Sequence, residues 1–314
     1  MQFGPEPPPE QEDDETDLLP CRQRVTLTGH DGAVLAIRFN KEGTYCLSCG
    51  KDRTVRLWNP ERGILVKTYE GHGYEVRDVC VAKDNSKFAT GGGDRQIFLW
   101  DVGSGKTIRR FKGHEKTINT LTFGAEDGVM FSGGYDTFVH VWDCRSRNYN
   151  AIQTLSGFKD SVTCVKATGT EIFASCVDGT LKRFDIRMGQ VCTDDFREPV
   201  TCVALSGDEA CVLVACMSDR MVLTDKSSGQ VLATYRGHKH RAYKIECGFT
   251  PTDAHVVGAS EDGFVYYWDL VRSNIAKQFR AHKDTVCSIA THAECHVLLT
   301  ASTDGEIKVW GPDG

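Results

Sequence analysis

Histidine, hydroxyl and aspartate side chains recur along the chain at a spacing that could support hydrolytic chemistry. The repeats align on seven aspartates, namely Asp52, Asp94, Asp136, Asp178, Asp219, Asp262 and Asp304. In a Ser-His-Asp set, the histidine removes the proton from a nucleophilic hydroxyl. Here the set recurs four times, each time beside a tryptophan, and no Gly-x-Ser-x-Gly segment accompanies it. We therefore predict that these residues are structural, that the chain has no catalytic residues and that it is not an enzyme.

Cysteine is the other residue type that could bind a metal or undergo redox chemistry. The chain has fourteen cysteines, and one pair, Cys46 and Cys49, has the Cys-x-x-Cys spacing of zinc and redox sites. Residues three apart in a strand point to opposite faces of the sheet, so this pair could not converge on one ion. We predict reduced core thiols in a reducing intracellular compartment, with no metal site and no cofactor.

Short strands must position these residues, because the apolar runs between turns are rich in β-branched and aromatic side chains. In the third unit such runs cover residues 118–123, 129–133, 138–142 and 152–155. Four strands repeated seven times, with 41 to 43 residues between successive aspartates, indicate a propeller of small antiparallel sheets. The predicted fold is therefore all-β, a seven-bladed β-propeller with four antiparallel strands per blade.

The two ends of the sequence predict how the ring closes. Residues 24–27 form a strand that precedes the first Gly-His pair and belongs to no complete unit. The last unit stops four residues after Trp310 and is one strand short. We expect the N-terminal strand to complete the last blade, because this closure removes two free sheet edges.

The uneven distribution of charge argues against several classes of function. Residues 1–20 contain seven acidic side chains, no basic side chain and five of the nine prolines. We predict a disordered acidic, proline-rich tail over residues 1–21 and the propeller over residues 22–314. The remainder is close to neutral and lacks a basic stripe, so we expect no direct sequence-specific nucleic-acid recognition. The apolar runs are too short to span a membrane, and we predict a soluble protein.

The Gly-His pairs, the turn aspartates and the Trp-Asp pairs resemble the WD-repeat family over residues 22–314. In that family a histidine, a serine or threonine, the aspartate and a tryptophan form a buried hydrogen-bonded tetrad. The resemblance implies four complete tetrads: His30, Ser48, Asp52 and Trp58; His72, Thr90, Asp94 and Trp100; His114, Ser132, Asp136 and Trp142; and His282, Thr300, Asp304 and Trp310. Loss of one member should leave buried partners unsatisfied, at about 1 to 3 kcal/mol each.

Three units depart from the tetrad pattern. The fourth has Phe158 in place of the histidine, and the fifth has no histidine. The sixth keeps His238 and Trp268 but has Gly258 where the others have a hydroxyl residue, and it contains a two-residue insertion near residues 239–241. We expect these three blades to depend on apolar packing.

WD-repeat proteins commonly bind partners through one face of the propeller, using residues three and five positions after the histidine and one before the aspartate. The resemblance implies the corresponding positions of this chain as contacts. The predicted partner-binding residues are Glu75, Arg77, Asn119, Tyr135, Arg241, Tyr243 and Glu261. Arginine and tyrosine dominate interface energetics, which favours this cluster as a binding surface.

A narrower resemblance is carried by segments such as GHGYEVRD at 71–78 and DIRMGQ at 185–190, in which residues 73–76 and 187–190 are not dictated by the propeller template. These segments are similar to the mitogen-activated protein kinase organizer subfamily of WD-repeat proteins. That resemblance implies a non-catalytic scaffold for signalling kinases and adaptors, or a spliceosome subunit in pre-mRNA splicing, located in the cytoplasm and nucleus. We expect a monomeric propeller that acts within larger assemblies.

An alternative hypothesis is a substrate receptor of a cullin-4 ubiquitin ligase. Residues 142–145 and 184–187 read WDCR and FDIR, which resemble the WDxR motif of such receptors. The motif is short and arises easily by chance, and an alternative role for Arg145 and Arg187 is ion pairing at strand ends. The sequence alone does not choose between these hypotheses.

Overall fold

The computed structural model describes residues 18–313, which form twenty-eight strands. In chain order the strands are β1 (Arg22–Leu27), β2 (Val34–Phe39), β3 (Cys46–Gly50), β4 (Thr54–Asn59), β5 (Ile64–Glu70), β6 (Val76–Val81), β7 (Lys87–Gly92), β8 (Gln96–Asp101), β9 (Thr107–Lys112), β10 (Ile118–Phe123), β11 (Val129–Gly134), β12 (Val139–Asp143), β13 (Gln153–Leu155), β14 (Val162–Ala167), β15 (Glu171–Cys176), β16 (Thr180–Asp185), β17 (Val191–Asp195), β18 (Val200–Leu205), β19 (Cys211–Cys216), β20 (Arg220–Asp225), β21 (Val231–Arg236), β22 (Cys247–Phe249), β23 (His255–Ala259), β24 (Phe264–Asp269), β25 (Ile275–Arg280), β26 (Val286–Thr291), β27 (Leu298–Ser302) and β28 (Ile307–Gly311). Among the described residues there is no helix of the length and apolar character that crossing a membrane requires.

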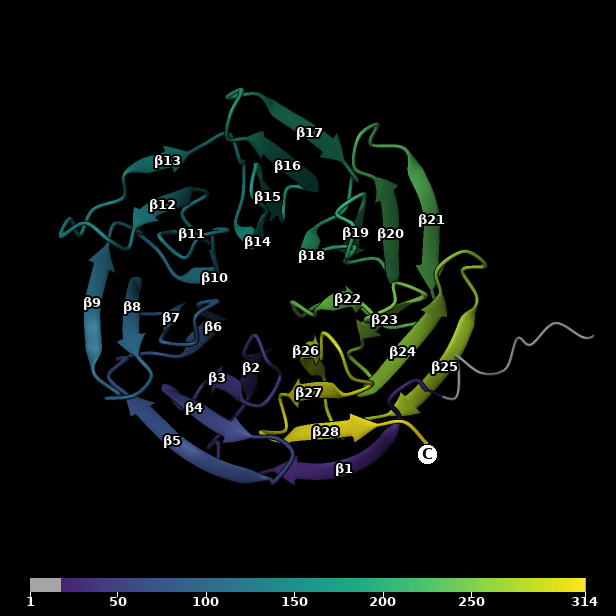
Figure 1. Ribbon diagram of the computed structural model, residues 1–314. Coiled ribbons are helices and arrows are strands. Elements are labelled where there is room, and N and C mark those ends of the chain that lie inside the picture. The colour runs from purple at the N-terminus through teal and green to yellow at the C-terminus, as the bar shows by residue number, and fades with distance from the viewer. Residues whose placement is uncertain (1–17, 314) are drawn as a thin grey trace, which may run out of the picture.

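The strands form seven antiparallel sheets of four strands each, arranged as blades around a central axis (Figure 1). Blades one to six run in order from β2–β5 to β22–β25, and blade seven contains β26, β27, β28 and β1. The first strand of each blade lies nearest the axis and the last lies at the rim (Figure 1). The predicted all-β, seven-bladed propeller is confirmed.

The ring closes where the two ends of the chain meet. β1 pairs antiparallel with β28, from Arg22 opposite Gly311 to Leu27 opposite Ile307. Leu27 is buried and packs against residues of both blade seven and blade one. The predicted closure is confirmed, and it leaves blade seven with four strands rather than three.

The described part of the chain begins at residue 18, so residues 18–21 of the predicted tail are placed, directly before β1. Leu19 is 3% exposed and packs with Ile245 and Tyr267 of blade six. The Tyr267 hydroxyl donates a hydrogen bond to the carbonyl of Pro20 at 2.9 Å. The rest of the predicted tail, residues 1–17, lies outside the described residues.

The core lies between blades, because each sheet buries both of its faces. Cys46 and Cys49 illustrate the pattern: Cys46 packs toward blade seven with Leu299, and Cys49 packs toward blade two with Phe88. The two thiols therefore point to opposite faces of β3, as the spacing predicts. All fourteen cysteines of the chain are free thiols. Rows of such buried apolar side chains supply most of the stabilisation, at about 25 cal/mol per Å² of apolar surface.

In six blades the innermost strand has a β-bulge near its start. The pairing with the second strand shifts by one residue there, which leaves one residue of the inner strand unpaired. The unpaired residues are Leu35, Arg77, Asn119, Thr163, Thr201 and Cys287. Blade six has a short β22 that pairs without irregularity. Bulges redirect side chains, and these lie on the face that carries the turns at the repeat aspartates, called here the top face.

Candidate functional site

The His, Thr, Asp and Trp of blade two form a continuous hydrogen-bonded chain. His72 Nδ1 lies 2.7 Å from Asp94 Oδ2, and His72 Nε2 lies 2.7 Å from Thr90 Oγ1. Trp100 Nε1 donates to the same Thr90 oxygen at 2.8 Å. The threonine hydroxyl therefore connects three of the four side chains, and its proton is directed at the imidazole.

The same connections recur in blades one, three and seven. The distances from histidine Nδ1 to aspartate Oδ2 are 2.8, 2.7 and 3.1 Å, and those from tryptophan Nε1 to the hydroxyl are 2.8, 2.8 and 2.9 Å. Burial would raise the pKa of Asp52, but the hydrogen bond from His30 outweighs it and lowers the pKa to about 2. In each set the four side chains are joined by these hydrogen bonds, which suits a structural role, and Asp136 Oδ1 of blade three is the one carboxylate oxygen of these sets that is buried without a partner among the described residues.

Four of the predicted contact residues come together on the top face between blades two and three. Arg77 lies with its guanidinium carbon 5.3 Å from the centre of the Tyr135 ring, in cation–π geometry. Its Nη1 donates to Asn119 Oδ1 at 3.0 Å, and its Nε lies 3.4 Å from Glu75. Together with Tyr74, which is 63% exposed, these residues are called here the blade two–three patch.

Asn119 positions the arginine from below. Its side chain is 6% exposed, and its Nδ2 donates to Ser161 Oγ at 2.8 Å and to the carbonyl of Val162 at 3.0 Å. Both N–H groups of the Asn119 amide thus donate to residues of blade four, and the amide oxygen accepts the hydrogen bond from Arg77. The arginine is thereby held in place before any partner arrives, which reduces the entropy lost on binding.

The absence of a side chain at Gly93 lets Tyr74 and Glu75 approach the turn of blade two. A Cβ atom at Gly93 would lie 2.9 Å from the carboxylate of Glu75 and 2.9 Å from Cβ of Tyr74. Both distances are shorter than van der Waals contact allows. This glycine occupies the position one before the aspartate, where Tyr135 stands in blade three.

The three predicted residues of blade six are arranged differently. Glu261 Oε1 accepts the backbone N–H groups of Arg241, Ala242 and Tyr243 at 2.6 to 2.9 Å. Burial would raise the pKa of Glu261, but these backbone bonds outweigh it and lower the pKa. Arg241 binds Asp219 of blade five through Nε and Nη2. Glu261 therefore organises the inserted loop, and both Arg241 and Tyr243 present exposed side chains.

The insertion also shifts the positions counted from His238. Glu246 lies opposite Ala259 as Asp78 lies opposite Gly91, although it follows its histidine by eight residues rather than six. Tyr243 is thus not a bulge residue of an inner strand and does not correspond to Arg77.

A charged cluster on the propeller axis was missed by the sequence reasoning. Arg38 of β2 binds Glu246 of blade six at 2.5 Å and Asp78 of β6 at 3.0 Å, and Ser288 donates to Glu246 at 2.5 Å. Burial would raise the pKa of Glu246, but attraction to Arg38 outweighs it and lowers the pKa. A polar residue six positions after the repeat histidine, as at Asp78 and Ser288, was the available signal.

Those polar residues join neighbouring blades. Asp78 Oδ2 accepts the N–H of Leu121 in blade three at 2.9 Å, and Ser288 Oγ accepts the N–H of Ile37 in blade one at 3.0 Å. From blade six, Lys244 reaches across to donate to the carbonyl of Asn119 at 2.9 Å. Lys244 of blade six therefore helps to hold Asn119, the buried residue of the patch, in place.

The arginines of the two WDxR-like segments lie on the face opposite the patch. The backbone N–H groups of Arg145 and Arg187 each donate to the aspartate two residues before them, at 2.8 Å. The Arg145 side chain is largely exposed and lies 3.8 Å from Glu126, a distance at which an exposed ion pair contributes little. A cavity of about 890 Å³ lined by Arg145 and Ile186 opens between blades three and four.

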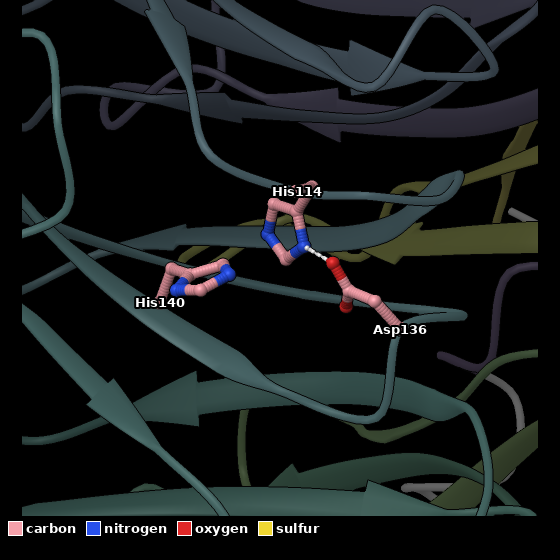
Figure 2. Close-up of side chains that lie close together, drawn as sticks. All are labelled: His114, Asp136 and His140. Atoms are coloured by element: carbon pink, nitrogen blue, oxygen red, sulfur yellow. Dashed lines mark hydrogen bonds and ion pairs between the residues drawn. The ribbon is translucent and has the colours of Figure 1, made fainter.

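Two groups of side chains in the described part of the chain could approach a metal ion. One is His114, Asp136 and His140, and the other is His282, Asp304 and Glu306. Each is the His–Asp pair of a tetrad with one additional side chain. The first group is buried and the second is partly exposed (Figure 2 shows the first).

Comparison with known proteins agrees with this geometry. Six segments, residues 21–59, 63–101, 105–143, 149–185, 229–269 and 273–311, match the family described as WD domain, G-beta repeat. The residues between 185 and 229 lie outside these matches and include β18 to β20, the three inner strands of blade five, whose unit has no histidine.

Relatives extend over nearly the whole chain. WD repeat domain-containing protein 83 of Rattus norvegicus is 55% identical over 292 residues, which cover 93% of this chain and 92% of that protein. The protein of that name from Homo sapiens is 52% identical over the same shares. A homolog from Dictyostelium discoideum is 28% identical over 90% of this chain and 96% of its own length. The narrower resemblance is confirmed, and the chain belongs to the WD-repeat family.

Proposed function

We propose that this chain is a non-catalytic scaffold that binds protein partners through the blade two–three patch. The observation that carries the proposal is Arg77, which is redirected by a bulge, held by Asn119 and stacked on the exposed ring of Tyr135. Arginine and tyrosine held in place in this way are typical of the residues that contribute most to protein interfaces. The family and the fold support a protein-interaction scaffold.

The sequence resemblance supports a choice of partners. The segment from Gly73 to Arg77, which carries part of the likeness to kinase-organising proteins, lies within or beside the patch. We propose signalling kinases and adaptors, or spliceosome subunits, as partners, with the protein in both cytoplasm and nucleus. A monomeric propeller within a larger assembly fits a patch that lies on a single ring.

Affinity purification of the full chain followed by quantitative mass spectrometry tests this function. The Arg77→Ala and Tyr135→Ala variants should recover about tenfold less of their partners than the unchanged protein, because each removes a central anchor. A matched control is Arg147→Ala with Tyr149→Ala, since these are an exposed arginine and tyrosine away from the patch and outside the WDxR-like segments. Equal loss in the control, or no loss in the patch variants, would contradict the proposal.

The identity of the captured proteins then separates the two classes of partner. Recovery of a kinase module supports a signalling scaffold, and sedimentation with small nuclear ribonucleoproteins supports a splicing subunit. Loss of one class in the patch variants, with retention of the other, would assign the patch to the class that is lost.

A second candidate function is the cullin-4 substrate receptor. The observation in its favour is that Arg145 and Arg187 are both exposed and follow equivalent aspartate-capped turns in adjacent blades. The double variant Arg145→Ala, Arg187→Ala should then lose the ligase adaptor, while Arg77→Ala retains it. Adaptor binding that is intact in the double variant would eliminate this role.

A further inference from the structure

The tetrad of blade three differs from the other three complete tetrads in the hydrogen bonding of one buried aspartate oxygen. In blades one, two and seven the aspartate Oδ1 accepts the N–H of the residue two positions later, at 3.1, 3.2 and 3.0 Å. Asp136 is 7% exposed, and its Oδ1 has no hydrogen-bond partner within residues 18–313. A buried carboxylate oxygen without a partner costs free energy, and a bound water molecule or metal ion would lower that cost.

Blade three also has a histidine where the other three blades do not. His140 stands two residues before the tryptophan, at the position of Arg56, Phe98 and Lys308. It is 8% exposed, and its ring centre lies 4.4 Å from that of His114. Figure 2 shows a ring nitrogen of His140 on the side that faces His114 and Asp136. Since His140 Nδ1 is 2.9 Å from Thr154 Oγ1, the nitrogen that faces the pair is Nε2.

We propose that His114, Asp136 and His140 form a binding site for a divalent transition metal of the zinc class. One ligand atom from each residue lies within 4.8 Å of the other two. Zinc–ligand distances near 2.1 Å place neighbouring ligand atoms of a tetrahedron about 3.4 Å apart, so metal binding must open the 2.7 Å hydrogen bond between His114 Nδ1 and Asp136 Oδ2 and displace its proton. Two histidines and a carboxylate occupy three positions, and the fourth is open to water or a small anion.

Each histidine has a hydroxyl partner at the ring nitrogen that is not proposed to bind the metal. His140 Nδ1 is directed at Thr154, and His114 Nε2 lies 2.6 Å from Ser132 Oγ. Metal-binding histidines usually donate from the nitrogen that does not bind the metal, which fixes the tautomer. Coordination at His114 Nδ1 requires its proton to be on Nε2, where it donates to the Ser132 hydroxyl. The serine oxygen then accepts from both His114 and Trp142.

Two comparisons within the chain argue against a purely packing role for His140. In blade two, Phe98 stacks on His72 at 4.0 Å and fills the same place without any nitrogen. In blade seven, Asp304 Oδ1 is already bonded by the N–H of Glu306, so that group lacks the unpaired oxygen. Blade three combines the unpaired oxygen with the additional ligand.

A cobalt(II) titration of the full chain, without a polyhistidine tag, tests the proposal. The unchanged protein should bind one Co²⁺ per chain with the visible absorption of a four-coordinate His and Asp site, and Zn²⁺ should displace it. Zn²⁺ should also raise the melting temperature, because a ligand that binds the folded state stabilises it. Thiolate charge-transfer absorption would instead report binding to the cysteines.

Three variants complete the experiment. His140→Phe copies blade two and should weaken Co²⁺ binding at least tenfold without lowering the melting temperature in metal-free buffer. Thr154→Val removes the partner of Nδ1 and should weaken binding less. Glu306→Gln, in blade seven, should leave it unchanged. Equal binding by His140→Phe, no visible band in the unchanged protein at excess Co²⁺, or a band dominated by thiolate would overturn the proposal.

Discussion

Blades two and six carry histidine, aspartate and tryptophan at corresponding positions, yet they are held together in different ways. In blade two the hydroxyl of Thr90 connects Trp100 to His72, and His72 in turn binds Asp94. Blade six has Gly258 at the place of the threonine, and Trp268 Nε1 donates to the carbonyl of Arg236 at 2.9 Å instead. One missing hydroxyl redirects the tryptophan.

The histidine of blade six also lacks the hydrogen bonds that its counterpart in blade two makes. Neither ring nitrogen of His238 has a hydrogen-bond partner in the described part of the chain, although the side chain is 2% exposed. Asp262 instead accepts from the N–H of Phe264 and the hydroxyl of Tyr266. The comparison teaches that the hydroxyl, rather than the histidine or the aspartate, connects the tetrad.

Blade six is secured by its neighbours instead. A Cβ atom at Gly258 would lie 2.7 Å from Met221 Cε of blade five, so that methionine occupies the space a threonine would need. Arg38 of blade one binds the buried Glu246, whereas the ion pair between Arg241 and Asp219 of blade five is exposed and contributes little. A complete tetrad thus holds a blade from within, whereas blade six depends on contacts across its boundaries.

The strongest way to break this comparison is to remove the contact between blade six and blade one. Arg38→Met should lower the free energy of unfolding by about 3 to 5 kcal/mol, because it leaves Glu246 and Asp78 as buried charges without a cation. Urea unfolding followed by tryptophan fluorescence measures the loss. Arg38→Lys keeps the charge and should lose less. A loss below about 1 kcal/mol in Arg38→Met would show that blade six does not depend on this contact.

Removing the histidine from the complete tetrad should have the next largest effect. His72→Phe leaves the Asp94 Oδ2 atom and the Thr90 hydroxyl without their partner and should cost about 2 to 4 kcal/mol. The shape of the site tolerates phenylalanine, since blade four has Phe158 at this position. Thermal or urea unfolding checks the value, and stability equal to that of the unchanged protein would contradict a structural role for the tetrad.

The pH dependence of stability distinguishes the two blades further. Burial, and to a lesser extent His240, lowers the pKa of His238 to about 4, and burial lowers that of His240 to about 4. The unfolded chain takes up protons near pH 6.5 and the folded chain does not, so stability is lost as the pH falls from about 6.5 to 4. Each histidine contributes a slope of about 1.4 kcal/mol per pH unit.

Unfolding measured at several pH values tests that slope. His238→Phe should lower the slope of stability against pH by the contribution of one histidine, whereas His72→Phe should leave the contributions of His238 and His240 unchanged. The tetrad carboxylates contribute at lower pH, because the pKa values of Asp52 and Asp304 are lowered to about 2. An unchanged slope in His238→Phe would mean that this histidine is already paired.

The smallest effect is expected for His238→Phe at pH 7. Replacing a buried group that has no partners by an apolar ring of similar shape should change stability by less than about 1 kcal/mol, with either sign. The same substitution that costs several kcal/mol in blade two should therefore be nearly neutral in blade six. Equal losses in His72→Phe and His238→Phe would remove the distinction between the two blades.

Much of the fold could be predicted because strand periodicity and turns are local properties of sequence. The predicted runs of the third unit agree with β10 to β13 to within one residue at each end. The placement of Arg77, Asn119 and Tyr135 on one surface could also be predicted, since each follows from the repeat spacing. Counting residues from the histidine did not identify the position equivalent to Arg77 in blade six, because an insertion precedes β22 and this strand has no bulge.

The contacts across the ring could not be predicted. Arg38 and Glu246 are 208 residues apart, and Lys244 and Asn119 are 125 apart. No local pattern specifies which inner strands face each other across the axis or how far a side chain extends over it. The unpaired oxygen of Asp136 could not be predicted either, because the groups around it depend on the path of the turn rather than on residue type.

The sequence by itself determined the seven repeats, the strands within them, the closure of the ring and the residues of the four tetrads. These follow from alternation and spacing over about 40 residues, a range that one blade contains. The tertiary structure alone decided which polar groups remain unpaired, how blade six is secured and how Arg77 is held. These depend on side chains from different blades meeting at fixed distances, which becomes defined only when the ring is closed and packed.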